Sequence, residues 1–262
     1  MLQSLKILAT TGRQTIPDVT KVTLPASYRG SPEIGDQPCV FGCSSCKDLC
    51  PTSAISLHEG KVTLDLGACV FCGECADECP EDKIAFTNNH LMATNNRLSL
   101  IIAEGAGHVV FHPETVRREI VNTFGSSLKL RQVSAGGCNA CELELNACGN
   151  VNFDMGRYGI EFVASPRHAD GIVITGPISI NMSEATQICH DSIPDPKIVV
   201  LTGACAISGG VFANSPALQR SYVERHGVDL YVPGCPPHPL TFINGILTMI
   251  RSKRACTVSS LN

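Results

Sequence analysis

Short apolar runs separated by longer mixed segments form the main pattern of the second half of the chain. The runs are rich in β-branched residues and end in Gly, Ser or Cys, while the spacers are long enough to form helices. This alternation is typical of parallel strands joined by helical crossovers, and it predicts an α/β domain. The five expected strands begin at Leu130, Ile160, Gly171, Lys197 and Val228.

Three of the spacers have helical character. Residues 181–190 and 240–251 are expected to be helices, and Pro239 suits the first turn of the second one because proline is favoured there. Residues 215–226 are a further helical candidate.

Composition and charge narrow the class of protein. The chain has 262 residues, of which 44% are hydrophobic, and a formal charge of −4, so no basic field for nucleic acid is expected. Residues 1–12 do not read as a signal peptide, and the apolar stretch 241–250 is shorter than the ~20 residues of a membrane-spanning helix. We therefore expect a cytoplasmic chain.

Cysteine is the outlier of the composition, with 15 residues. Disulfides do not persist in the cytoplasm, and an odd number of cysteines fits a disulfide framework poorly. Clustered cysteines in such a chain favour metal sites.

Two runs of four cysteines lie close together. Residues 69–80 read C-V-F-C-G-E-C-A-D-E-C-P, which is the C-x2-C-x2-C-x3-C-P run of bacterial ferredoxins. Residues 39–51 read C-V-F-G-C-S-S-C-K-D-L-C-P, the same run with one extra residue between its first two cysteines.

In runs of this kind three cysteines hold one 4Fe–4S cluster, and the fourth lies too far along the chain and holds the other cluster. Zinc is the alternative, because CxxC pairs also occur in zinc ribbons, but two copies ending in Cys-Pro disfavour it. The two expected ligand sets are Cys39, Cys43, Cys46 and Cys79 for the first cluster, and Cys69, Cys72, Cys75 and Cys50 for the second.

The two runs belong to an internal repeat, and each Cys-Pro is followed by a stretch that reads as a short hairpin with a Gly or Asn turn. A domain this small lacks a core of its own, so the clusters are expected to serve as one. Together with L-P-A-S-Y-R-G-S-P-E-I (24–34), the segment resembles the bacterial 8Fe ferredoxins and the two-cluster subunit of complex I and formate hydrogenlyases. The resemblance implies an α+β ferredoxin-like domain at 39–92, after an N-terminal extension at 1–38.

Four more cysteines follow predicted strands: Cys138 and Cys141 after the first, Cys205 after the fourth and Cys235 after the fifth. Open parallel sheets bind ligands at the carboxyl ends of their strands, and glycines in these loops would let the main chain approach a bulky group. Four converging thiolates indicate a third 4Fe–4S cluster; the alternative is that they are buried packing thiols. The remaining thiols, expected to be packing or incidental, are Cys148, Cys189 and Cys256.

Four motifs carry a second resemblance. They are G-G-C-N-A-C-E-L-E-L-N-A (136–147), R-Y-G-I-E-F-V-A-S-P-R-H-A-D (157–170), G-A-C-A-I-S-G-G-V-F (203–212) and V-P-G-C-P-P-H-P (232–239). They resemble the small, cluster-bearing subunit of group 4 membrane-bound NiFe hydrogenases, including formate hydrogenlyase, and the 20-kDa subunit of complex I.

That resemblance implies an α/β flavodoxin-like domain with a parallel sheet at 128–262. It also implies that the ligands of the proximal cluster are Cys138, Cys141, Cys205 and Cys235. Complex I subunits carry two adjacent cysteines at the first position, so the CxxC form is similar to the hydrogenase side of the family.

The two modules are usually separate subunits, and here residues 93–127 join them. This connecting segment holds a strand-like piece and then a helix that starts with proline, and it is not rich in Gly and Ser. We expect it to be ordered against a partner.

Motifs for a nucleophile, for phosphate loops and for a nickel centre are absent from the sequence, so we expect an electron-transfer subunit with three 4Fe–4S clusters. The resemblance implies a NiFe-type large subunit, membrane subunits and an electron donor (ferredoxin, formate or CO dehydrogenase) as partners. It also implies peripheral attachment to the inner face of the cell membrane. The alternatives are a complex I-like quinone or sulfur-compound reductase, and a stand-alone redox or iron–sulfur sensor.

Two polar residues are expected to tune the proximal cluster. Arg167 and His168 follow the second strand directly, so the parallel-sheet rule predicts them at the same edge as the ligand loops. A guanidinium there would stabilise the reduced cluster, and the imidazole could move a proton. The alternative is a capping or structural loop in which Asp170 is a cap and Arg167 pairs with a carboxylate.

Overall fold

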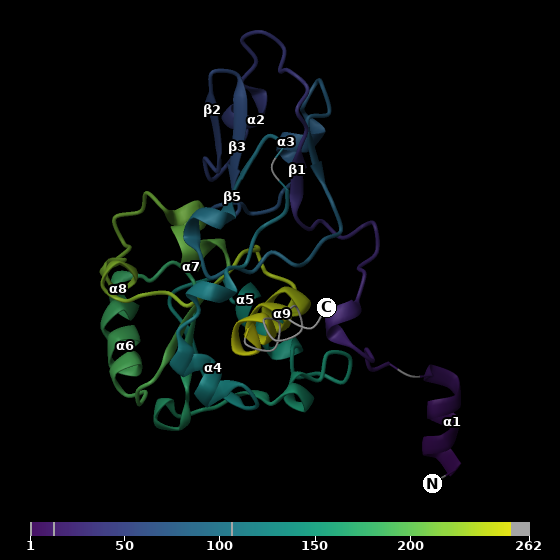
Figure 1. Ribbon diagram of the computed structural model, residues 1–262, viewed down its shortest axis with the longest axis vertical. Helices are drawn as coiled ribbons and strands as arrows, with labels where there is room; N and C mark the ends of the chain where they lie inside the picture. The colour runs from purple at the N-terminus through teal and green to yellow at the C-terminus, as the bar shows by residue number, and fades with distance from the viewer. Residues whose placement is uncertain (1, 13, 106, 253–262) are drawn as a thin grey trace, which may run out of the picture.

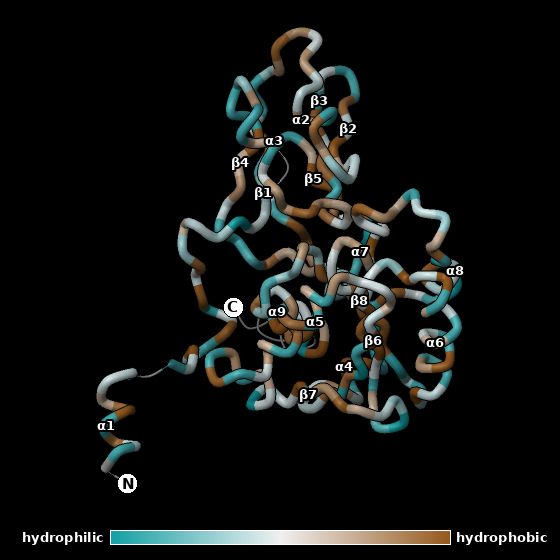
Figure 2. The backbone as a smooth tube through the Cα atoms, turned by 180° about the vertical axis from the view of Figure 1, so that it is seen from behind, coloured by the Kyte–Doolittle hydropathy of each residue, from teal (hydrophilic) through white to brown (hydrophobic). Residues whose placement is uncertain are grey.

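The computed structural model describes residues 2–12, 14–105 and 107–252 (Figure 1). A smaller part with the two four-cysteine runs lies at the top of the view, and a larger α/β part lies below it. The helix α1 (Leu2–Thr11) stands away from both parts in Figures 1 and 2.

The larger part is built on a parallel sheet of five strands in the order β10-β9-β8-β6-β7. This is the 2-1-3-4-5 order of flavodoxin-like folds, so the predicted fold class of this part is confirmed. Each expected strand forms at its predicted apolar run, although β6 begins two residues earlier than predicted, at Leu128. The strands are β6 (Leu128–Ser134), β7 (Ile160–Phe162), β8 (Gly171–Thr175), β9 (Ile198–Thr202) and β10 (Leu230–Val232).

Both faces of the sheet are covered, which explains why the strands read as continuous apolar runs. In the central strand β8, Val173 packs with one hydrophobic cluster, whereas Ile172 and Ile174 pack with the other. The helices beside the Val173 face are α4 (Arg118–Phe124), α5 (Ala140–Ala147) and α9 (Pro239–Ile250), and those beside the opposite face are α6 (Ile180–Asp191) and α8 (Ser221–Arg225).

Helix α9 is the most deeply buried helix of the α/β part, and Figure 2 colours it largely hydrophobic. It begins as predicted with Pro239, and the His238 ring before it accepts a hydrogen bond from the Leu240 N–H at 3.1 Å. Helix α6 is also confirmed, whereas only residues 221–225 of the third helical candidate form α8.

The smaller part contains two small sheets. The hairpin predicted after the first run forms from β2 (Ile55–His58) and β3 (Lys61–Asp65). The hairpin predicted after the second run is wrong, because β4 (Ile84–Phe86) pairs antiparallel with the distant β1 (Pro32–Ile34). The first two strands of each sheet enclose the short helices α2 (Ser45–Asp48) and α3 (Glu74–Asp77), which carry cysteines.

The connecting segment is ordered against this chain itself. Its strand β5 (Ile101–Ala103) pairs antiparallel with β3, and α4 packs against α9. Thr94 also exchanges two main-chain hydrogen bonds with Tyr231 of β10, at 3.0 and 2.8 Å. The segment thus ties the two parts together; the domain boundaries at 38/39, 92/93 and 127/128 stay a prediction.

Within the described ranges, no helix is both long and apolar enough to cross a membrane.

We expect Ile246→Ala to lower the free energy of unfolding by about 3 kcal/mol, because Ile246 is fully buried in α9 and its truncation leaves a cavity. The exposed Thr248 on the same helix is the matched control, and Thr248→Ala should change stability by no more than about 0.5 kcal/mol. Denaturant unfolding under anaerobic conditions, followed by circular dichroism, measures both. Equal effects of the two variants would contradict this view of α9.

Candidate iron–sulfur sites

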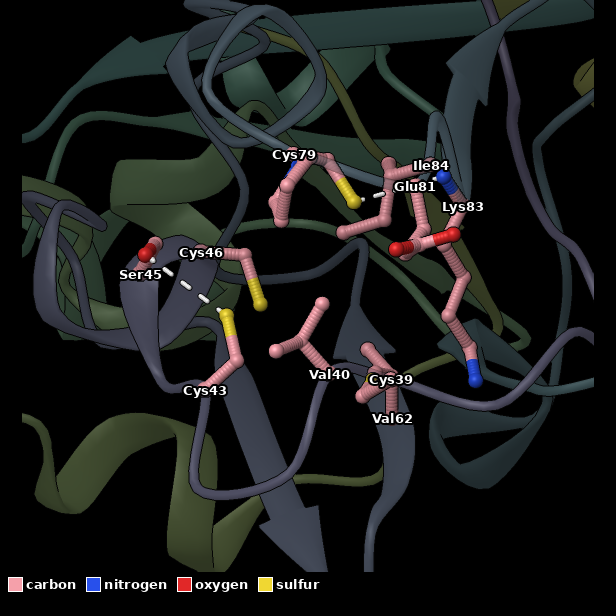
Figure 3. Close-up of a pocket in the computed structure, with 11 residues that line it drawn as sticks. Cys39, Val40, Cys43, Ser45, Cys46, Val62, Cys79, Glu81, Lys83 and Ile84 are labelled. Carbon is pink, nitrogen blue, oxygen red and sulfur yellow. Dashed lines mark hydrogen bonds between the residues drawn. The ribbon is translucent and has the colours of Figure 1, made fainter.

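The first group of thiols lies at the far end of the smaller part. Cys39, Cys43, Cys46 and Cys79 line one pocket, and Figure 3 shows the sulfur atoms of Cys43, Cys46 and Cys79 turned toward a common space. Cys46 is placed by α2, while Cys79 arrives from the second run just after α3.

The second group lines a neighbouring pocket and contains Cys69, Cys72, Cys75 and Cys50. Here Cys75 is placed by α3, and Cys50 arrives from the first run. The structure therefore brings the fourth cysteine of each run to the three cysteines of the other, which is the crossed grouping that the spacing predicts. Ligation by these thiols stays a prediction.

Main-chain N–H groups point at several of these sulfurs. Ala54 N donates to Cys50 Sγ at 3.2 Å, Lys83 N to Cys79 Sγ at 3.3 Å and Phe71 N to Cys69 Sγ at 3.3 Å. Hydrogen bonds of this kind stabilise thiolates and adjust the potential of a bound cluster. Phe71 reaches its position with a left-handed backbone (φ 57°), as part of the tight wrapping of the run.

The third group sits at the carboxyl edge of the parallel sheet. Cys138 and Cys141 lie in the loop after β6 and the start of α5, Cys205 in the short helix α7 (Ala204–Ser208) after β9, and Cys235 in the loop after β10. Two main-chain hydrogen bonds join the last two loops, from Gly203 N to Val232 O at 2.8 Å and from Ala204 N to Gly234 O at 2.9 Å.

Glycine makes the close approach of these loops possible. A Cβ on Gly203 would lie 2.6 Å from Cys141 Sγ, and Gly203 also has a left-handed φ of 91°. A Cβ on Gly210 would lie 3.0 Å from Cys205 Sγ. The loops therefore form a cradle that any larger residue would fill, as a bulky cofactor requires.

Burial makes isolated thiolates costly in the second and third groups, and in the first group it raises the pKa of Cys46. It raises the pKa of Cys69 and of Cys141 to about 12 and that of Cys75 to about 11, and neighbouring thiolates act in the same direction. Thiolates crowded in this way need positive charge at their centre, which iron supplies. The donor sets thus fit iron–sulfur clusters.

A single metal ion would need a more compact arrangement of ligands than a cluster. Among residues 2–12, 14–105 and 107–252, no three His, Cys, Asp or Glu side chains are arranged to hold one metal ion. A zinc site needs its ligands close around one point, whereas a cubane separates its four thiolates by the width of the cluster.

Two of the remaining cysteines behave as packing thiols. Cys148 is fully buried at the end of α5, where its Sγ donates to Glu144 O at 3.4 Å, and Cys189 is half-buried in α6. Neither is among the residues that line the pockets of the first and second groups. Cys256 lies outside the described residues.

The expected position of Arg167 and His168 is wrong. Strand β7 pairs only with Leu128–Leu130 at the beginning of β6, so it ends well short of the carboxyl edge. The 3-10 helix η5 (Pro166–His168) follows, and Asp170 N then donates to Lys129 O at 2.7 Å. Both residues therefore lie at the opposite edge of the sheet from the third group. The Asp170 carboxylate accepts a hydrogen bond from Lys129 N of β6 at 2.6 Å, which fastens the end of this loop to the sheet.

A different guanidinium, Arg220, lies beside the third group. It donates to the main-chain oxygens of Pro177, Cys205, Ala206 and Ile207 at 2.8–3.1 Å, and so fixes the loop that carries Cys205. Burial raises the pKa of Cys205, and the charge of Arg220 opposes that rise. No sequence signal marks this residue, because its partners are carbonyl groups and not a recognisable side-chain motif.

The chain matches two families over separate segments. Residues 38–83 match the 4Fe-4S dicluster domain, and residues 138–249 match the family described as NADH ubiquinone oxidoreductase, 20 Kd subunit. The probable membrane-bound hydrogenase subunit mbhJ of Pyrococcus furiosus is 36% identical over 129 residues, which are 49% of this chain and 77% of that protein.

The chain belongs to the NADH ubiquinone oxidoreductase 20 Kd subunit family. Within this family, formate hydrogenlyase subunit 7 of Escherichia coli is 39% identical over 51% of this chain and 55% of its own length. An NADH-quinone oxidoreductase subunit of Heliobacterium modesticaldum is 40% identical over 44% of this chain and 66% of its own length. These relatives are subunits of oxidoreductases, as the motifs imply.

We expect Cys50→Ser to remove the cluster of the second group and to spare that of the first, because Cys50 lies in the second pocket. Iron analysis and EPR of the reduced full-length chain measure the loss. Cys189→Ser, at a half-buried thiol outside the groups, is the control and should keep all the iron. Loss of the first cluster in Cys50→Ser would overturn the crossed grouping.

We expect Gly203→Ala to lose the third cluster, about four iron atoms per chain, while the first two remain. The added methyl group would collide with Cys141 Sγ. Gly156→Ala is the matched control, since a Cβ there meets nothing within 4 Å, and it should keep the wild-type iron content. A fully loaded Gly203→Ala protein would contradict the third site.

Proposed function

We propose that this chain is the electron-transfer subunit of a complex I-like, group 4 hydrogenase or formate hydrogenlyase-type complex, and that it carries three 4Fe–4S clusters. The proposed ligands of the three clusters, in order along the path, are Cys39, Cys43, Cys46 and Cys79; Cys69, Cys72, Cys75 and Cys50; and Cys138, Cys141, Cys205 and Cys235.

One contact between the two parts carries this proposal. A Cβ on Gly67 would lie only 2.7 Å from Ile207 Cγ2, so the loop leading to Cys69 touches the helix that bears Cys205. The second and third cysteine groups are thus joined by packed protein. Within the smaller part, the helices α2 and α3 are packed together and bring the first group next to the second.

When bound, each cluster would accept and release one electron. The residues of the chain hold the three groups in sequence and surround them with packed, mostly apolar side chains, for one hydrophobic cluster runs from Ile55 and Leu64 to Ile174 and Ile207. No substrate-activating constellation is needed in such a subunit.

The catalytic centre would then lie on a NiFe-type large subunit that covers the third group. Two observations support this: Cys138 and Cys235 are exposed in the isolated chain. Large apolar side chains on the elements that carry the third group are exposed as well, namely Leu143, Val211 and Phe212. Membrane subunits and a donor (ferredoxin, or formate or CO dehydrogenase) complete the proposal, with peripheral attachment to the inner membrane face.

The spacing Cys138-Asn-Ala-Cys141 favours the hydrogenase side of the family over complex I subunits, which carry two adjacent cysteines there. A quinone or sulfur-compound reductase built on the same relay is the alternative to a hydrogenase. Nickel in the co-purified large subunit would decide between them. A free chain in native extract would instead favour a stand-alone sensor.

The purified complex tests the relay. With the donor reduced, we expect Cys205→Ser to abolish electron transfer to the large subunit while the first two clusters still become reduced, because their proposed ligands all precede residue 80. EPR of the donor-reduced complex and hydrogen production report the two steps separately. The Cys189→Ser complex is the control. Unimpaired hydrogen production in Cys205→Ser would refute the proposed path.

A further inference from the structure

The two four-cysteine runs place different side chains at the same position. Four residues after the last cysteine of each run stand Ala54 and Lys83, and both N–H groups donate to that cysteine, at 3.2 and 3.3 Å. Both residues are buried, with 4% and 2% exposure. Ala54 lines the pocket of the second group and Lys83 lines that of the first. The two pockets can therefore be compared at one equivalent position, which is apolar in one and charged in the other.

The buried ammonium of Lys83 has two fixed partners. Its Nζ lies 2.7 Å from Glu104 Oε1 and donates to Gln37 O at 2.7 Å. Glu104 is held in turn, because it accepts a hydrogen bond from Val62 N of β3. The charge is therefore fixed in the wall of the first pocket, where Figure 3 shows Lys83 with the thiols.

The ammonium keeps its charge. Burial lowers the pKa of Lys83, but the hydrogen bond to Glu104 and the neighbouring Cys39 thiolate outweigh burial, and the pKa lies above its ordinary value. Lys83 lines the first pocket together with Cys39 whereas Glu104 does not, so the positive member of the pair is the one that faces the thiols.

We propose that Lys83 is a tuning residue that holds the reduction potential of the cluster on Cys39, Cys43, Cys46 and Cys79 above that of the cluster beside Ala54. Reduction adds one negative charge to a cluster. A fixed ammonium in the low-dielectric wall stabilises that charge and shifts the equilibrium toward the reduced state. Glu104 positions the ammonium and partly offsets it.

The inference rests on the proposed cluster ligation, and it gives the two ferredoxin-type clusters different tasks. An electron that arrives from a donor would rest on the first cluster, further from Ile207, before it passes to the second. A higher reduction potential at the first cluster favours electron transfer from the donor and slows electron transfer to the second cluster.

The test is an EPR-monitored redox titration of the full-length chain with all clusters loaded, in which Cys39→Ser identifies the signal of the first cluster. Lys83→Met should lower the reduction equilibrium constant of that cluster about tenfold, which is 59 mV for a one-electron couple. The signal of the second cluster should not move.

Two variants separate tuning from a structural role. Glu104→Gln removes the offsetting charge and should raise the potential of the first cluster, opposite in sign to Lys83→Met. Lys47→Ala removes an exposed lysine next to Cys46 and should leave the potential unchanged, because water screens that charge. If the Lys83→Met protein does not retain its first cluster, the double variant Lys83→Met/Glu104→Gln replaces it, because it leaves no unpaired buried charge. The reduction potential of the first cluster in the double variant should be lower than in the wild type.

An unchanged first-cluster potential in Lys83→Met, or shifts of the same sign in Lys83→Met and Glu104→Gln, would overturn the inference. If Cys39→Ser removes none of the cluster signals that the wild type shows, the proposed ligation is refuted instead. The two failures are therefore distinct.

Discussion

The approach of the second cysteine group to the third depends on the contact between Gly67 and Ile207. Glycine at 67 leaves no side chain between the loop that leads to Cys69 and the helix that carries Cys205. The Arg97 guanidinium packs beside the same contact and pairs with Asp65 of β3. Two modules with separate sheets thereby share one hydrophobic cluster, and the second and third groups of thiols come close to each other.

Electrostatics sets the second constraint. Each cysteine group gathers thiols that burial and mutual repulsion would keep protonated, and the protein answers with hydrogen bonds from main-chain N–H groups and with a few placed cations. Arg220 fixes the loop of Cys205, and Lys83 stands at the first group, whereas the second group has only Ala54 at that position. On the proposed ligation, two similar cysteine runs would therefore serve clusters with different potentials.

The sequence alone allowed the cysteine groups and the parallel strands to be predicted, because both follow from local spacing and from continuous apolar runs such as Gly171–Thr175. What it missed depends on distant partners. The three-residue strand Pro32–Ile34 pairs with β4, which lies some fifty residues further along the chain. Strand β7 ends early, so Arg167 lies at the edge of the sheet opposite to the third cysteine group. Arg220 binds carbonyl oxygens, which leave no pattern in a sequence.

The position of the iron atoms tests the central claim most directly. Anomalous diffraction at the iron edge, on anaerobically purified full-length chain or its complex, should show three compact groups of four iron atoms. The middle group should lie between the thiols of Cys69 and Cys50, with the other two groups on either side of it. Zinc at any of these positions, or only two iron groups in a fully loaded sample, would contradict the account.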